Sequence, residues 1–93
     1  MLNFERTGHF KKDFKKLLKQ QKDITKLETV LAYLIKEEPL PKEYLDHPLR
    51  NCRQYTDSRE CHIEPDWLLI YRIDDTNKIL RLIRTGSHSD LFS

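Results

Sequence analysis

The sequence predicts a small α+β fold, in which an N-terminal strand and a helical hairpin pack on a mainly antiparallel sheet. The first half of the chain carries apolar residues at helical spacing, whereas the second half carries short apolar runs that are typical of strands. At 93 residues the chain can bury one modest core and is too short for two. Residues 1–93 are therefore expected to form a single domain.

A short strand is expected at residues 2–6, followed by a helix that Thr7 caps. Four apolar residues recur at helical spacing in this helix and are expected in the core: Phe10, Phe14, Leu17 and Leu18. A second helix is predicted from a candidate capping box, Thr25 to Glu28. Its apolar stripe runs over residues 27–35, and Pro39 ends it.

Residues 37–51 follow neither period and contain prolines, so this segment is expected to be an ordered connecting loop. Three strands should follow, the last two joined by a turn at residues 74–77 into a hairpin: residues 58–63, 67–73 and 78–85. The run from Trp67 to Tyr71 is apolar at every position, which is typical of a central strand covered on both faces. A short helical turn at residues 89–92 is expected to close the chain.

The formal net charge is only +2, but it is unevenly distributed. Residues 1–42 contain ten Lys or Arg and six acidic residues, whereas residues 43–93 contain seven and nine. Five lysines fall between Lys11 and Lys19, where they could contact RNA phosphates or an acidic partner, or form an ordinary solvated helix face.

With two cysteines and no apolar segment at residues 1–10, a reducing cytoplasm is the expected location. No apolar run reaches membrane-spanning length, so no membrane partner is expected.

Polar side chains gather around two of the predicted strands. On a strand, Glu60, His62 and Glu64 would share one face, opposite Arg59 and Cys61. An RNA phosphodiester can be cleaved without a metal by a base for the 2′-hydroxyl proton, an acid for the 5′-oxygen and a cation for the developing charge. The chain offers all of these groups: His47, His62, His88, Asp66, Arg59 and Arg84. Taken singly, each histidine is more often structural or solvated than catalytic.

Metal and nucleotide cofactors are not expected. Cys61, His62, Asp66 and His88 offer ligand atoms, but Cys61 and His62 are adjacent on a strand and point to opposite faces. The chain contains no C-x-x-C or H-E-x-x-H spacing, and its two glycines cannot form a phosphate loop. Trp67 is expected in the core unless its indole stacks on a base, and Phe92 is expected to dock for packing or stacking.

Three motifs occur in order: D-H-P-L at 46–49, R-E-C-H-I-E-P-D-W-L-L-I-Y at 59–71, and R-T-G-S-H-S-D-L-F at 84–92. Together they resemble the YafQ-type toxins of the RelE/ParE superfamily of bacterial type II toxin-antitoxin systems, over nearly the whole chain. The resemblance implies a small RelE-like fold and a ribosome-dependent, metal-independent mRNA endoribonuclease that inhibits translation by cutting mRNA in the A site. It also implies neutralisation by a cognate antitoxin, with operator DNA contacted only through the antitoxin complex.

The resemblance and the residue chemistry together give a set of expected roles. Five residues are expected to act in catalysis: His62 and His88 in proton transfer, His47 and Asp66 in positioning, and Arg84 in stabilising phosphate charge. Five more are expected to bind substrate: Trp67, Phe92, Arg59, Lys11 and Lys15. Asn51 stands where the family commonly has Gly, in a longer loop, and Asn tolerates a left-handed backbone.

Two alternatives stay open. A ParE-like member of the superfamily would poison DNA gyrase, although three histidines in matching motifs argue against this function. A non-enzymatic RNA-binding or ribosome-binding module would use the basic helix and would tolerate loss of His88.

Overall fold

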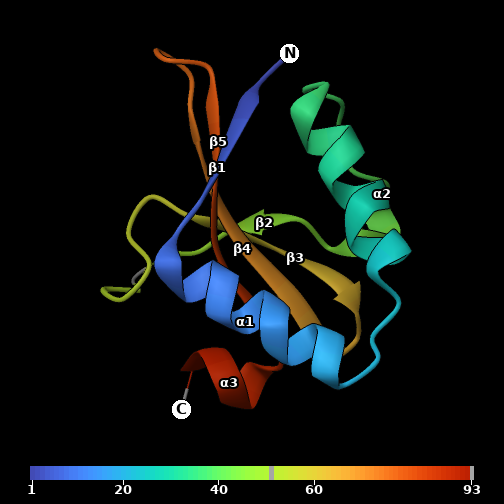
Figure 1. Cartoon of the computed structure of the whole chain (residues 1–93). Coiled ribbons are helices and arrows are strands. Elements are labelled where there is room, and N and C mark those ends of the chain that lie inside the picture. Colours follow the sequence, from blue (N-terminus) through green and yellow to red (C-terminus); the bar gives the residue numbers. More distant parts are fainter. Residues whose placement is uncertain (51, 93) are drawn as a thin grey trace.

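The computed structural model describes residues 1–50 and 52–92, so the expectation for Asn51 lies outside the described residues. The elements follow in this order (Figure 1): β1 (Asn3–Arg6), α1 (Gly8–Lys19), α2 (Ile24–Ile35), the 3-10 turn η1 (Lys42–Tyr44), β2 (His47–Pro48), β3 (Arg59–Glu64), β4 (Trp67–Asp74), β5 (Ile79–Gly86) and α3 (His88–Phe92). Among the described helices, none has the length and apolar character needed to span a bilayer.

The strands form one five-stranded sheet in the order β1-β5-β4-β3-β2. β1 pairs in parallel with β5, and every other pair is antiparallel, which confirms the predicted α+β fold. The connecting segment was expected to hold no strand, but His47 and Pro48 pair with Glu60 and Arg59. This strand has only two residues, and its pairing partner lies more than ten positions along the chain, so no local pattern reveals it. Proline is tolerated there because β2 is an edge strand.

Both long helices cover the same face of the sheet and diverge from their connection (Figure 1). Thr7 caps α1 as predicted, since its Oγ1 accepts from the Phe10 amide at 3.0 Å. The prediction for α2 is wrong by two residues, because Asp23 caps it by accepting from the Thr25 amide at 3.1 Å. Leu18 is also not in the core: its exposed fraction is 52%, because the diverging helices leave that side of α1 uncovered.

The main core lies between the helices and the sheet, and β4 supplies its centre through Trp67, Leu69 and Tyr71. A smaller apolar cluster lies on the opposite face, where Leu68 and Ile70 pack with Tyr55 and Leu91. Strand β4 is therefore buried on both faces, as its continuous apolar run predicts. The short α3 packs on the second face, and this placement brings His88 beside His62 of β3.

Candidate active site

Three histidines from three different elements lie in a row on the face of the sheet that α3 shares. His47 comes from the edge strand β2, His62 from β3 and His88 from the start of α3. The ring centroids of His47 and His62 are 6.5 Å apart, and those of His62 and His88 are 5.7 Å apart. The structure therefore brings together three of the histidines that the sequence singled out.

The carboxylate of Glu60 lies beside two of these rings. Its Oε1 atom is 3.3 Å from Nε2 of His47 and 3.3 Å from Nε2 of His62. The Glu60 side chain is only 7% exposed, whereas that of His47 is 48% exposed. Because a carboxylate only accepts hydrogen bonds, Glu60 orients a ring that presents an N–H and stabilises positive charge on it. The sequence pattern placed Glu60 on the correct face but did not include it among the site residues.

Asp66, in the turn between β3 and β4, fixes the third histidine. Its Oδ1 accepts from the backbone amide of His88 at 3.0 Å and lies 2.8 Å from Nδ1 of the same residue. These contacts, led by the amide hydrogen bond, hold the pKa of Asp66 below its usual value. With the Nδ1–H directed at Asp66, the Nε2 of a neutral His88 ring is free to accept a proton.

Two aromatic residues, Phe92 and Tyr55, extend the histidine row beyond His88. The ring of Phe92 is 41% exposed and its centroid lies 6.4 Å from that of His88. Tyr55 meets Phe92 edge to face at 5.6 Å and donates from its hydroxyl to the Leu91 carbonyl at 2.8 Å. Sequence reasoning left Tyr55 unassigned because its neighbours are polar. The exposed Phe92 face is suited to stacking on a base.

A family comparison matches residues 2–93 to a model described as a bacterial toxin of type II toxin-antitoxin systems, YafQ. The chain belongs to the YafQ toxin family. It is 44% identical over 91 residues to the mRNA interferase toxin YafQ of Escherichia coli strain B/BL21-DE3, covering 97% of this chain and 95% of the relative. YafQ in the crystal structure of the E. coli DinJ-YafQ complex has a TM-score of 0.88 and 42% identity over 100% of both chains. A metal-bound toxin from Helicobacter pylori has a TM-score of 0.92 and 44% identity over 99% of this chain and 100% of the relative.

Trp67, which was expected to contact substrate, is buried in the structure. The indole is 1% exposed, and its Nε1 donates to Oγ1 of Thr85 at 3.0 Å. Arg59 is also displaced from the histidine row, because it shares its face with Cys61 beneath the helices and pairs with Asp46 at 3.1 Å. Both residues therefore support the fold and do not line the row.

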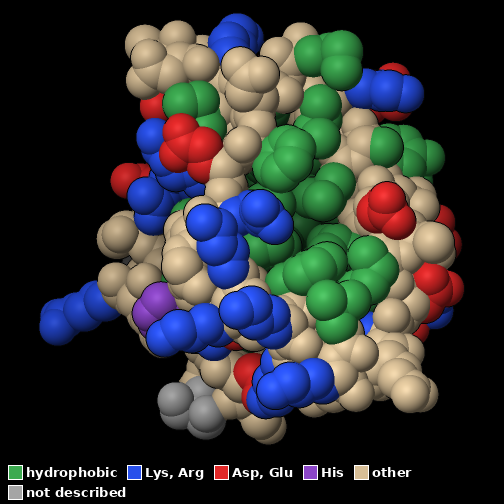
Figure 2. Space-filling view, viewed as in Figure 1, with side chains coloured by type: hydrophobic (Ala, Val, Ile, Leu, Met, Phe, Trp, Pro, Cys, Tyr) green, Lys and Arg blue, Asp and Glu red, His purple; other side chains and the backbone are tan. Residues whose placement is uncertain are grey.

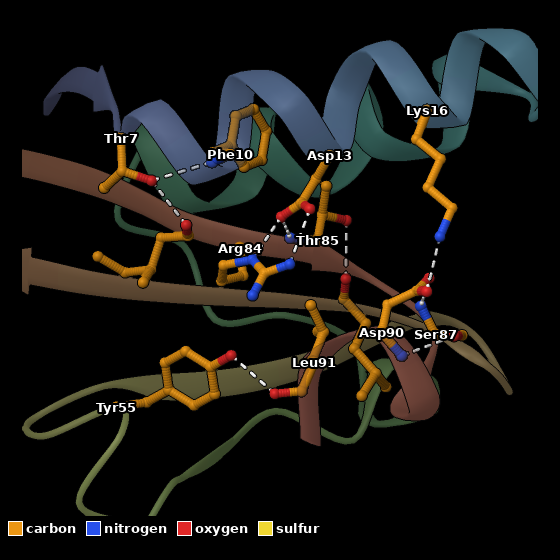
Figure 3. Close-up of polar contacts among 12 residues, drawn as sticks. Thr7, Phe10, Asp13, Lys16, Tyr55, Arg84, Thr85, Ser87, Asp90 and Leu91 are labelled. Atoms are coloured by element: carbon orange, nitrogen blue, oxygen red, sulfur yellow. Dashed lines mark hydrogen bonds and ion pairs between the residues drawn. The ribbon is translucent and has the colours of Figure 1, made fainter. Parts of the chain in front are cut away.

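Arg84, which was expected to stabilise phosphate charge, is held by Asp13 in the structure. Its Nε and NH2 groups donate to the two Asp13 carboxylate oxygens at 2.7 and 2.9 Å (Figure 3). This hydrogen bonding raises the pKa of Arg84, and the guanidinium charge is neutralised by Asp13. A bulge lies next to Arg84, since Leu82 and Arg84 pair with the consecutive residues Tyr71 and Ile70.

A second bulge corrects the predicted trio of ionisable residues on β3. The register shifts between His62 and Glu64, and Glu64 turns to the helices, where Lys26 lies 2.6 Å and Lys22 3.7 Å away. Lys11 and Lys15 are exposed on α1, which covers the face opposite the histidine row. Their expected contact with substrate therefore stays a prediction, and it would involve RNA beyond the scissile phosphate.

The structure also groups a candidate metal site that sequence reasoning excluded. One ligand atom from each of His47, Glu60 and His62 can be chosen so that all lie within 4.8 Å of one another. Two imidazoles and a carboxylate suit Zn²⁺ or Cu²⁺. Of these three residues, the sequence-based prediction included only His62, together with Cys61, Asp66 and His88. The E-x-H spacing on one strand face was the available signal, but the third ligand comes from β2.

Proposed function

We propose that this chain is the toxin of a type II toxin-antitoxin system and cleaves mRNA in the ribosomal A site, which inhibits translation. The observation that carries the proposal is the row of three histidines, each of which lies against the carboxylate of Glu60 or Asp66. YafQ-family relatives named mRNA interferases support the same activity. A gyrase poison would have no use for this histidine row.

The row can perform metal-independent transesterification. His88 Nε2 takes the proton of the ribose 2′-hydroxyl, the 2′-oxygen bonds to phosphorus, and the bond from phosphorus to the 5′-oxygen breaks. His62 donates a proton to that leaving oxygen, which leaves a cyclic 2′,3′-phosphate and a 5′-hydroxyl. Because Arg84 is engaged with Asp13, the groups left to stabilise the charge of the phosphorane are the imidazoles of His47 and His62, which lie beside Glu60.

Dependence on the ribosome is supported by the openness of the row. The side chains of His47 and His88 are 48% and 53% exposed, and Phe92 stands beside them at the surface. Such a surface supplies reacting groups but little to orient a flexible single strand. The ribosome, in the cytoplasm, would present the mRNA in the required conformation.

The decisive experiment compares cleavage by the wild-type chain, His62→Ala and His88→Ala on translating ribosome complexes, with 5′ ends mapped by primer extension. Each substitution should slow cleavage by at least about 100-fold, because general acid–base groups contribute that much. His9→Ala is the matched control, since His9 is exposed on α1 away from the row. Wild-type rates for both site variants would overturn the nuclease mechanism.

An antitoxin is the second proposed partner, supported by the DinJ-YafQ complex of E. coli. Figure 2 shows apolar side chains gathered between α1 and α2, with Lys and Arg side chains beside them. Phe4 is 51% and Leu18 52% exposed, and Lys11 and Lys15 lie one turn or two from Leu18 on the same side of α1. An acidic amphipathic antitoxin segment suits this surface, and operator DNA would be contacted only through the resulting complex.

Metal binding is a second candidate function, favoured by the grouping of His47, Glu60 and His62. The H. pylori toxin described as metal-bound supports it. An ion there would occupy imidazole nitrogens that the proposed mechanism uses, so it would inhibit cleavage and not promote it.

A further inference from the structure

We infer that Asp13 is a positioning residue for the cleavage site, because it fixes the end of β5 and thereby the place of α3, which carries His88 and Phe92. The effect of Asp13 on the rate of cleavage rests on the proposed function. The contacts that carry the inference are independent of that function, and they link residues more than seventy positions apart in the chain.

Asp13 uses both carboxylate oxygens to hold β5. They accept from Arg84 Nε and NH2, and Oδ2 also accepts from the Thr85 backbone amide at 3.2 Å (Figure 3). The Asp13 side chain is only 11% exposed, and Asp13 is the sole acidic residue in α1. A single carboxylate with three donors in a nearly buried position defines where α1 meets the strand end.

The last residues of β5 transmit this placement to α3. Thr85 is itself fixed, since its hydroxyl donates to the Leu68 carbonyl at 2.7 Å. Gly86 has φ +153°, and a Cβ there would meet Oδ2 of Asp90 at 3.1 Å, so glycine lets the chain turn back closely onto α3. Ser87 and Asp90 then cap each other, through amide-to-side-chain bonds of 3.1 and 3.2 Å.

α1 holds α3 at a second point. Lys16, one turn beyond Asp13, donates to Oδ1 of Asp90 at 2.8 Å (Figure 3). At its far end α3 is anchored by Leu91, which is 1% exposed and accepts from Tyr55. A five-residue helix has little stability of its own, so these tertiary contacts define its position.

His88 begins α3, only two residues after Gly86. Its 5.7 Å separation from the His62 ring and its contact with Asp66 therefore depend on where β5 ends. A displacement of about 1 Å in a reacting group can slow a reaction about 100-fold. Asp13 reaches none of these groups and acts through Arg84 and Thr85.

The test compares Asp13→Asn and Asp13→Glu with Asp23→Ala, which removes the cap of α2 and controls for lost stability. Asp13→Asn should slow cleavage at saturating toxin by about 10- to 100-fold, and Asp13→Glu should recover part of that rate. By NMR, the His88 ring resonances should shift in Asp13→Asn, and the pKa of Asp66 should rise toward its ordinary value. A structural role alone would leave both signals as they are in Asp23→Ala.

A wild-type rate and unchanged His88 resonances in Asp13→Asn would overturn the inference. If Asp13→Asn does not fold, Lys16→Met releases Asp90 at the surface and should shift the same resonances and slow cleavage; unchanged resonances there would also overturn it. Failure of the proposed function would give a different result. The wild-type chain would then not cleave mRNA, or His88→Ala would cleave it at the wild-type rate, while the His88 resonances would still report the position of α3.

Discussion

Oε1 of Glu60 lies 3.3 Å from Nε2 of His62, in a position where the carboxylate is almost fully buried and the ring is 18% exposed. A buried carboxylate at this distance stabilises a positively charged imidazole, which is the form needed to protonate a leaving oxygen. The same oxygen faces His47, so one carboxylate serves two of the three rings.

Glu60→Gln should therefore slow mRNA cleavage by about tenfold or more while the fold is retained, because the amide keeps the shape and removes the charge. Single-turnover cleavage on ribosome complexes measures this effect. Glu28→Gln, at an exposed position on α2, is the matched control. Equal rates for the two variants would remove Glu60 from the mechanism.

Cu²⁺ or Zn²⁺ should bind at one equivalent and inhibit cleavage, since the ion would engage His47, Glu60 and His62. Titration calorimetry checks the stoichiometry, and addition of a chelator should restore the rate. His47→Ala should weaken binding, whereas His9→Ala should not. Inhibition that is unaffected by loss of His47 would place the ion elsewhere.

Trp67→Phe should destabilise the fold by about 1–3 kcal/mol, because it leaves the buried Thr85 hydroxyl without its indole donor. Urea unfolding followed by circular dichroism measures this change. Cleavage per folded molecule should stay close to wild type. A large loss of cleavage with unchanged stability would instead show that the indole contacts the substrate.

Acid should loosen α3. Hydrogen bonding from Lys16, then from Ser87, lowers the pKa of Asp90, and His88 lowers that of Asp66. Both groups have folded pKa values below their unfolded ones, so their stabilisation is complete above the ordinary carboxyl pKa and is lost as pH falls through the lowered values. Unfolding midpoints between pH 6 and pH 3 should fall, and Asp90→Asn should show a shallower fall. Identical pH profiles would contradict this assignment.

The two cysteines should differ in reactivity. Cys61 is fully buried, and desolvation, followed by the nearby acids Asp46 and Glu60, raises the pKa of its thiol to about 12. Iodoacetamide at pH 8 should modify the half-buried Cys52 in the native protein and leave Cys61 intact until urea is added. Mass spectrometry of peptides locates the label, and early labelling of Cys61 would show that β3 opens in the native state.

Local patterns were sufficient for most elements of the fold. The helical spacing of Phe10, Phe14 and Leu17 and the continuous apolar run of β4 each report a buried face directly, because burial repeats with the geometry of the element. The cap of α2 was misplaced since Asp23 and Thr25 are both good capping residues and only geometry separates them.

The three histidines of the site could be predicted from the sequence, but their arrangement in space could not. His47, His62 and His88 stand in three recognisable motifs, and their approach depends on the pairing of β2 with β3 and on the docking of α3. Glu64 was assigned to the wrong face, because a bulge in the sheet interrupts the alternation on which the prediction relied. The partner of Arg84 was missed because Asp13 lies 71 positions away in the chain.

The sequence by itself determined the fold class, the family and the set of titratable groups, since residue type, period and motif order are properties of the chain. Only the tertiary structure decided which of those groups are available for chemistry. It buried Trp67, joined Arg84 to Asp13 and placed Glu60 between two histidines. The physical reason is that a charge or ring becomes reactive or inert through neighbours distant in sequence, and those neighbours are chosen by packing and register.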